Sequence, residues 1–282
     1  MNDELKPGQM TDTGFPLSIH HSSFRAGSYI LRAMPISDLL QPHILLLAPL
    51  IVFVAYVVFG ISGFGSTLIA VPLLAHLFPL KFVVPFFVIL DCVGAFNMGL
   101  RLRADMMRRE ITLLLPFMAL GILAGVYLLV RVSPELLLGG LGVFVVIFGV
   151  SYVVKSGKGM ALPHWIGAPI GLFGGATSAM FGIGGPIYVF FLAGRNATPT
   201  QIRATMPVIF MFTTVARIVL FIGAGLYSPA ALVAAVALLP VMALGVWAGH
   251  HLHLNLAQET VIRVMGVLLV LSGISLIVRA LA

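Results

Sequence analysis

The sequence is poor in charged residues and holds a single cysteine. Charged residues make up 9% of the 282 positions and hydrophobic residues 60%, whereas a soluble domain has about 25% charged and about 45–50% apolar residues. This composition excludes an ordinary soluble domain and indicates a polytopic membrane protein. Cys92 lies inside an apolar run, so the chain can form neither an internal disulfide nor a cysteine metal cluster.

Several functional signatures are absent as well. The sequence has no Walker A phosphate loop and no Gly-x-Ser-x-Gly nucleophile motif, so neither ATP-driven pumping nor serine-nucleophile chemistry is indicated. His250, His251 and His253 lie at a predicted span end without an acidic cluster, which is typical of interfacial histidines rather than of a metal site. The net charge of +7 comes from basic residues spread over short loops, a pattern of membrane proteins rather than of nucleic-acid binding. We therefore expect no enzyme activity, no cofactor, no metal and no nucleic-acid partner.

What the chain has instead is a series of apolar segments after a polar tail. The tail, residues 1–43, contains scattered glycines and prolines, and we expect it to be mobile or to lie at the membrane interface. Six later segments are long and apolar enough to span a bilayer unbroken; they cover residues 82–100, 111–130, 136–154, 206–223, 229–249 and 261–280. Two further apolar runs, residues 44–78 and 165–193, are each interrupted by a glycine-rich stretch.

The interruptions predict broken membrane helices. Gly182, Gly184 and Gly185 are followed by Pro186; glycine costs a helix interior about 1 kcal/mol relative to alanine, and proline is tolerated at a first helical turn. We expect two short helices to meet there, with Pro186 at or near the first position of the second one. The stretch 60–67 has the same character in the first half. A half-helix that begins inside the membrane directs unpaired N–H groups into a cavity, which suits an anion, and two matching breaks point to a transporter's substrate site.

The two halves of the chain resemble each other in sequence. Residues 114–125 align with residues 238–249, so that Pro116 matches Pro240, and the same offset pairs glycines further along each half. Such a register of proline and glycine indicates an internal duplication. We predict an all-α polytopic membrane protein of two homologous halves, each with one broken or hairpin helix and three transmembrane helices. The predicted parts are a first repeat over residues 44–154, a linker over 155–164 and a second repeat over 165–282.

The distribution of basic residues favours inverted halves. The loop 101–109 is strongly basic, which places it in the cytoplasm, whereas the matching loop 223–228 carries no charge. The bias is reversed after the broken runs, where the second half has Arg195 and Arg203 and the first half has only Lys81. Inversion requires an odd number of crossings in each half, which follows if each broken run is a hairpin that returns to the same side. A parallel arrangement of full crossings places a similar share of basic residues inside, and it stays open.

These features carry a resemblance to a known family. A glycine-rich break near the start of each half, a Gly-x-Gly-Gly motif followed by Pro186, and a duplicated four-segment unit resemble the TauE/SafE family of membrane permeases, which includes sulfite exporters. The resemblance covers residues 44–281, and Arg203-Ala204-Thr205 resembles the family's Ala-x-x-Thr pattern. The first half departs from the family, with Lys81-Phe82-Val83-Val84-Pro85 at the corresponding place and the looser Gly63-Phe64-Gly65-Ser66-Thr67 at its break. The resemblance implies secondary transport of sulfite, sulfonates or related small organic anions across a bacterial inner membrane.

Two charged residues stand inside predicted spans. Arg217 lies in the middle of the span 206–223, where a charged side chain costs on the order of 2.5–3.5 kcal/mol on insertion scales and so needs a partner, a cavity or a ligand. Its guanidinium can clamp two oxygens of a sulfite or sulfonate, or form an internal ion pair without substrate contact. Asp91 is the natural partner in such a pair, because alignment of Pro85 with Pro207 places the two charges about one helical turn apart on equivalent helices. A buried carboxylate is also a candidate to carry a coupling proton.

The predicted site combines the two breaks with these charges. We expect backbone N–H groups of the break glycines to cradle the anion. Hydroxyl groups that are candidate neutral donors, although small hydroxyls are equally common at helix contacts, belong to Ser66, Thr67, Thr177, Ser178, Thr205, Thr213 and Thr214. The predicted substrate-binding residues, with Asp91 as the coupling or ion-pair residue, are Gly63, Phe64, Gly65, Ser66, Thr67, Gly182, Gly184, Gly185, Thr205, Thr213 and Arg217.

The sequence predicts a secondary transporter that moves a small sulfur-containing oxyanion through the lipid bilayer by alternating access, with a proton or another ion as coupling partner. Two other hypotheses stay open: an anion channel, and a membrane-embedded enzyme or assembly factor that acts on sulfur compounds. Saturable counter-flow distinguishes the carrier from the channel, and conversion of a labelled substrate indicates the enzyme. The exact anion, the direction of transport, the coupling ion, the side of the tail and the oligomeric state do not follow from the sequence.

Overall fold

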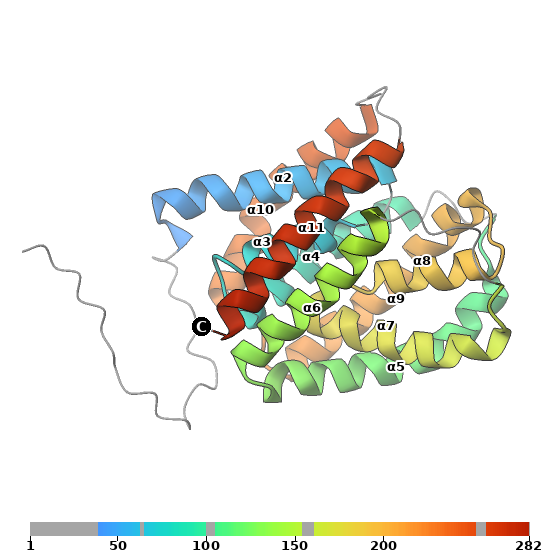
Figure 1. The fold of residues 1–282 in the computed structure, drawn as a ribbon. Helices are drawn as coiled ribbons and strands as arrows, with labels where there is room; N and C mark the ends of the chain where they lie inside the picture. Colours follow the sequence, from blue (N-terminus) through green and yellow to red (C-terminus); the bar gives the residue numbers. More distant parts are fainter. Residues whose placement is uncertain (1–38, 63–64, 100–104, 154–160, 252–257, 282) are drawn as a thin grey trace, which may run out of the picture. The chain divides into compact units, whose positions relative to one another are not determined.

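The structure is a computed structural model that describes residues 39–62, 65–99, 105–153, 161–251 and 258–281 (Figure 1). The predicted tail lies outside the described residues up to position 38, and so do Gly63, Phe64 and His253. The described residues form helices and no strands. The prediction of an all-α protein is therefore confirmed.

Each predicted half begins with two helices separated by a short break and continues with three unbroken helices (Figure 1). In the first half these are α2 (Pro42–Ser62), α3 (Ser66–Leu74), α4 (Leu80–Gly99), α5 (Arg108–Arg131) and α6 (Pro134–Val153). In the second half a short 3-10 helix (His164–Ile166) precedes α7 (Gly167–Phe181), α8 (Gly185–Gly194), α9 (Pro199–Gly223), α10 (Pro229–His251) and α11 (Gln258–Leu281). The helices follow the predicted segments, except that α9 begins well before the predicted residue 206.

Long apolar helices with exposed apolar faces confirm a membrane protein. Within the described part of the chain, five helices (α2, α5, α6, α9 and α10) are long and apolar enough to cross a bilayer. Their outward faces carry large apolar side chains that are more than half exposed: Leu46, Leu120, Ile147, Val219, Val236 and Trp247. A soluble protein would bury such faces, so they fit contact with lipid.

Both predicted breaks are present, and a left-handed glycine marks each one. Gly182 follows α7 with φ 74°, and its N–H donates to the Ser178 carbonyl at 2.9 Å, which closes the helix with a glycine C-cap. The next helix, α8, has Pro186 in its first turn, as predicted. In the first half, Gly65 precedes α3 with φ 95°, a conformation that glycine adopts without steric cost.

Glycines that match between the halves lie at matching helix contacts. A Cβ atom added at Gly125 of α5 would collide with the Ala176 carbonyl of α7, and one added at Gly249 of α10 would collide with the Val57 carbonyl of α2. Small residues of this kind let helix backbones approach closely in membranes. The first segment of each broken run thus packs against an unbroken helix of the other half. This exchange supports the predicted duplication.

α6 and α11, which hold equivalent places in the two halves, pack against each other in opposite directions. A Cβ atom added at Gly142 would lie 2.8 Å from the Gly273 carbonyl, and one added at Gly149 would lie 2.9 Å from the Gly266 carbonyl. Residue numbers therefore rise along one helix as they fall along the other. Equivalent helices run antiparallel when two halves are inverted. The contact supports the inverted arrangement, which stays a prediction.

Candidate substrate site

Arg217, in α9, is buried although it is charged. The residue is 2% exposed, and it donates to the Thr213 carbonyl (Nε, 3.3 Å), the Ser178 carbonyl (Nη1, 3.0 Å) and the Thr214 hydroxyl (Nη2, 3.3 Å). These bonds use three of the five N–H donors of a guanidinium. Among the described residues, the other two donors have no acceptor and are left for a ligand or water.

The Ser178 carbonyl fixes Arg217 to the second break. This carbonyl lies in the last turn of α7 and accepts hydrogen bonds from both the Gly182 N–H and Arg217 Nη1. A helix C-terminus leaves carbonyl groups unpaired and carries partial negative charge, so it stabilises a cation. The guanidinium is therefore held in place by neutral groups rather than by a carboxylate.

Asp91, in α4, is held by two hydroxyl groups. Its Oδ1 accepts hydrogen bonds from the Tyr56 hydroxyl of α2 at 2.9 Å and from the Ser66 hydroxyl of α3 at 3.2 Å. Its Oδ2 accepts none from the residues that the structure describes. The carboxyl group thus joins three helices and keeps one oxygen that can take a proton.

Arg217 and Asp91 line one small cavity that both breaks reach. The other lining residues are neutral: Phe59, Gly65, Ser66, Thr67, Ala95, Ser178, Gly182, Phe210 and Thr214. The volume of the cavity is about 20 Å³, which is room for about one water molecule. Among the described ion pairs, none within 4.0 Å joins Arg217 to Asp91. The two opposite charges face a common space without direct contact.

The first turn of α3 forms one wall of this cavity. Gly65, Ser66 and Thr67 all line it, and the first hydrogen bond of the helix runs from the Ile69 N–H to the Gly65 carbonyl at 3.3 Å. The N–H groups before Ile69 have no partner within the helix, and the end of the helix carries partial positive charge. Such an end is suited to bind an anion.

The structure brings together part of the predicted site. The predicted residues that line the cavity are Gly65, Ser66, Thr67, Asp91, Gly182 and Arg217, and those that do not are Gly184, Gly185, Thr205 and Thr213. Thr205 accepts a hydrogen bond from the Met107 N–H at 3.1 Å, and Thr213 donates to the Phe210 carbonyl at 3.1 Å. Both hydroxyl groups therefore serve contacts within the protein. The predicted Gly63 and Phe64 lie outside the described residues.

Sequence reasoning missed the aromatic and small residues around the two charges. Phe59, Ala95 and Phe210 line the cavity, and Tyr56 holds Asp91. An apolar side chain in an apolar helix gives no sign of whether it faces a cavity, a core or lipid. Tyr56 did carry a signal, because a tyrosine hydroxyl inside an apolar span needs a partner. The hydroxyl-bearing residues Ser178 and Thr214, which were expected as neutral donors, both line the cavity.

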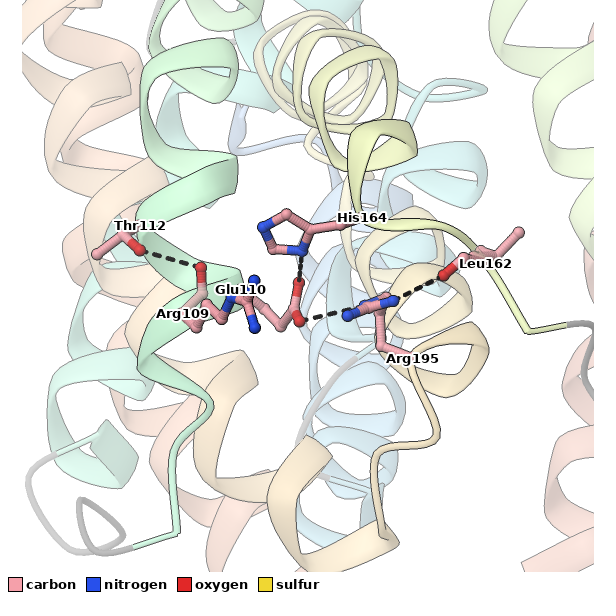
Figure 2. A network of polar contacts seen from close by, with 6 residues as sticks. All are labelled: Arg109, Glu110, Thr112, Leu162, His164 and Arg195. Atoms are coloured by element: carbon pink, nitrogen blue, oxygen red, sulfur yellow. Dashed lines mark hydrogen bonds and ion pairs between the residues drawn. The ribbon is translucent and has the colours of Figure 1, made fainter.

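A second buried polar cluster lies at the start of α5 (Figure 2). The Glu110 side chain is 5% exposed; it pairs with Arg195 (Nε to Oε1, 3.1 Å) and lies 3.4 Å from Nδ1 of His164. Arg195 also donates from Nη1 to the Leu162 carbonyl at 2.8 Å. The cluster joins the start of α5 to the segment before α7 and to the end of α8, and it does not line the cavity.

Comparisons with known proteins identify the family. Residues 48–276 match the family described as Sulfite exporter TauE/SafE. The chain is also 33% identical over 176 residues to the "Probable inner membrane transporter protein TsaS" of Comamonas testosteroni, and the match covers 60% of this chain and 71% of that protein. No solved structure matches the chain significantly. With its apolar helices, two of them broken, the chain is a multi-pass inner-membrane transporter and belongs to the TauE/SafE family.

Proposed function

We propose that this protein is a secondary transporter that carries a small sulfur-containing oxyanion across the membrane by alternating access. The observation that supports this best is a buried arginine that shares a small cavity with the N-terminus of a half-helix. Sulfite and sulfonates present several oxygens, and both of these groups donate hydrogen bonds to such oxygens. The name of the matching family supports a sulfur oxyanion as the substrate.

The site is equipped to replace the hydration shell of an anion. The first-turn N–H groups of α3 and the two remaining N–H groups of Arg217 are charged or partly charged donors. The hydroxyl groups of Ser66, Thr67 and Thr214 line the same cavity and add neutral donors. Because helices hold these groups in place before the ligand arrives, little ordering is needed on binding. Phe59 and Phe210 supply apolar walls for the carbon part of a sulfonate.

The small size of the cavity supports a carrier whose walls move. A sulfur oxyanion is larger than one water molecule, which is about what the cavity can hold. We therefore expect the walls of the cavity to move before the substrate enters. The half-helices beside the breaks are suitable moving parts, because the glycines between them tolerate large changes in backbone dihedral angles. A ligand that bound only one state would trap that state, so transport needs the gradient of the anion itself or a second ion.

Uptake of labelled sulfite into proteoliposomes tests this proposal, with sulfate, taurine, sulfoacetate and chloride as competitors. We expect saturable uptake that a sulfonate competes away. We expect Arg217→Ala to lower that uptake about 100-fold, because the loss of two hydrogen bonds from a charged group costs about 3 kcal/mol. Arg203→Ala is the matched control, since Arg203 is an exposed arginine of the same helix, and it should transport at the wild-type rate.

The same experiment separates the alternatives. Wild-type flux in a folded Arg217→Ala protein would leave Arg217 with a structural role at the end of α7. Flux that does not saturate and shows no counter-flow would favour a channel, and chemical conversion of sulfite by purified protein would favour an enzyme. Absence of uptake under every imposed gradient would contradict a sulfur oxyanion as the substrate.

A further inference from the structure

We propose that Asp91 takes up a proton before the cavity accepts an anion, so that one proton and one monovalent anion cross the membrane together without net charge. This inference rests on the proposed transport function. It specifies the coupling ion and the charge of the substrate.

The net charge around the cavity depends on the protonation of Asp91. Within the described part of the chain, Arg217 and Asp91 are the charged residues among those that line it. When Asp91 is ionised, their formal charges cancel, and an anion would add an unpaired negative charge to a buried space of low dielectric. When Asp91 is protonated, the positive charge of Arg217 remains and a monovalent anion balances it.

The contacts of Asp91 leave one of its carboxylate oxygens open to a proton. Tyr56 and Ser66 both donate to Oδ1, so Oδ2 is the oxygen that can receive the proton. No direct ion pair holds Asp91 to Arg217 among the described pairs, so protonation does not have to break a salt bridge. The proton that binds on one side of the membrane leaves from the same oxygen, with the anion, on the other side.

Asp91 is better suited to carry a proton than the titratable groups around it. The titratable groups that face it are the Tyr56 hydroxyl from α2 and the Arg217 guanidinium from α9, and neither exchanges a proton readily near neutral pH. Cys92 is its neighbour on α4 and does not line the cavity. Of the other helices that pack against α4, α3 and α7 contain no acidic or basic residue. The remaining two, α6 and α10, carry Glu135, His250 and His251 only in a terminal turn.

This balance of charge predicts a preference among anions. A sulfonate or hydrogensulfite, with one negative charge, neutralises Arg217 when Asp91 is protonated. Sulfate, with two negative charges, would leave one charge unpaired in the cavity, which is costly in a low dielectric. We therefore expect monovalent sulfur oxyanions to be transported in preference to divalent ones.

Labelled methanesulfonate in proteoliposomes provides the test, because its charge stays at −1 throughout the usable pH range. In the wild type, one pH unit of inside-alkaline gradient should drive about tenfold accumulation of the anion. A membrane potential clamped with K⁺ and valinomycin should drive none. A trapped pH dye should report one proton for each methanesulfonate, and this measurement does not depend on any variant.

Asp91→Asn should convert the coupled carrier into one that moves the anion alone. The side-chain carbonyl oxygen of the introduced asparagine keeps an acceptor for Tyr56 and Ser66, so we expect the variant to fold, whereas it has no carboxyl group to protonate. The pH gradient should no longer drive accumulation, and an inside-positive potential of 100 mV should drive about 50-fold accumulation. Cys92→Ser, at the neighbouring position outside the cavity, should behave as the wild type.

The outcomes separate this inference from the proposed function. Net charge movement in the wild type, or a pH gradient that still drives accumulation in Asp91→Asn, would overturn the inference and leave anion transport standing. Absence of uptake of both methanesulfonate and sulfite by folded wild-type protein would overturn the transport proposal itself.

Discussion

Single residues show two ways in which this protein keeps a charge inside. Arg217 is surrounded by carbonyl and hydroxyl groups, whereas Glu110 is paired with Arg195 and lies beside His164. Neutral partners satisfy the hydrogen bonds of a charge and leave its field available to a ligand. An opposite charge cancels that field, so the Glu110 cluster is suited to join segments rather than to bind substrate.

Arg195→Ala should destabilise the protein without changing its transport specificity. Removal of one partner leaves the buried Glu110 carboxylate uncompensated, which costs about 3 kcal/mol, the low end of the usual range, because Arg195 is a quarter exposed. Thermal unfolding of purified protein in detergent measures the loss. The double variant Glu110→Leu, Arg195→Ala should recover most of it, since no unpaired charge remains. A single variant as stable as the wild type would show that the pair contributes nothing.

At the scale of helices, long apolar runs predicted most of the fold, and polar helix ends were harder to predict. α9 begins at Pro199. The predicted start was residue 206, because Gln201 and Arg203 interrupt the apolar pattern from which the span was predicted. The signal for the true start was present, since Thr198 and Gln201 form a capping box around Pro199. The charges of the cavity could be predicted because a charge inside a span needs a partner or a ligand. Its aromatic walls could not, because helix packing decides which apolar face turns inward.

Gly125→Val should disrupt the contact between α5 and α7. The added side chain meets the Ala176 carbonyl, and backbone cannot move aside as a flexible side chain can, so we expect a loss of stability of about 3 kcal/mol. The repeat predicts a similar loss for Gly249→Val in α10, which meets the Val57 carbonyl. Unfolding in detergent measures both, with Leu123→Val at a half-exposed position of α5 as control. A well-tolerated valine at either glycine would contradict the close approach.

At the scale of the whole molecule, the orientation of the two halves decides which loops share a side of the membrane. Inverted halves place the loop before α5 and the loop before α10 on opposite sides, and parallel halves place them on the same side. In a Cys92→Ser background, we expect a membrane-impermeant maleimide added to whole cells to label Ala224→Cys and not Asp105→Cys. Labelling after the cells are opened confirms that both cysteines are reactive. Equal labelling of the two in whole cells would contradict inversion.

The exchange of helices between the halves also constrains how such a chain arose. α7 lies against α5, and α2 lies against α10, so each half supplies a glycine-bearing helix against which the other half's first broken segment packs. A half expressed alone would leave that segment without its glycine-lined surface. The predicted duplication then implies that an ancestor with a single copy of the unit needed a second, identical chain, and that gene fusion turned this partner into the other half of the same molecule.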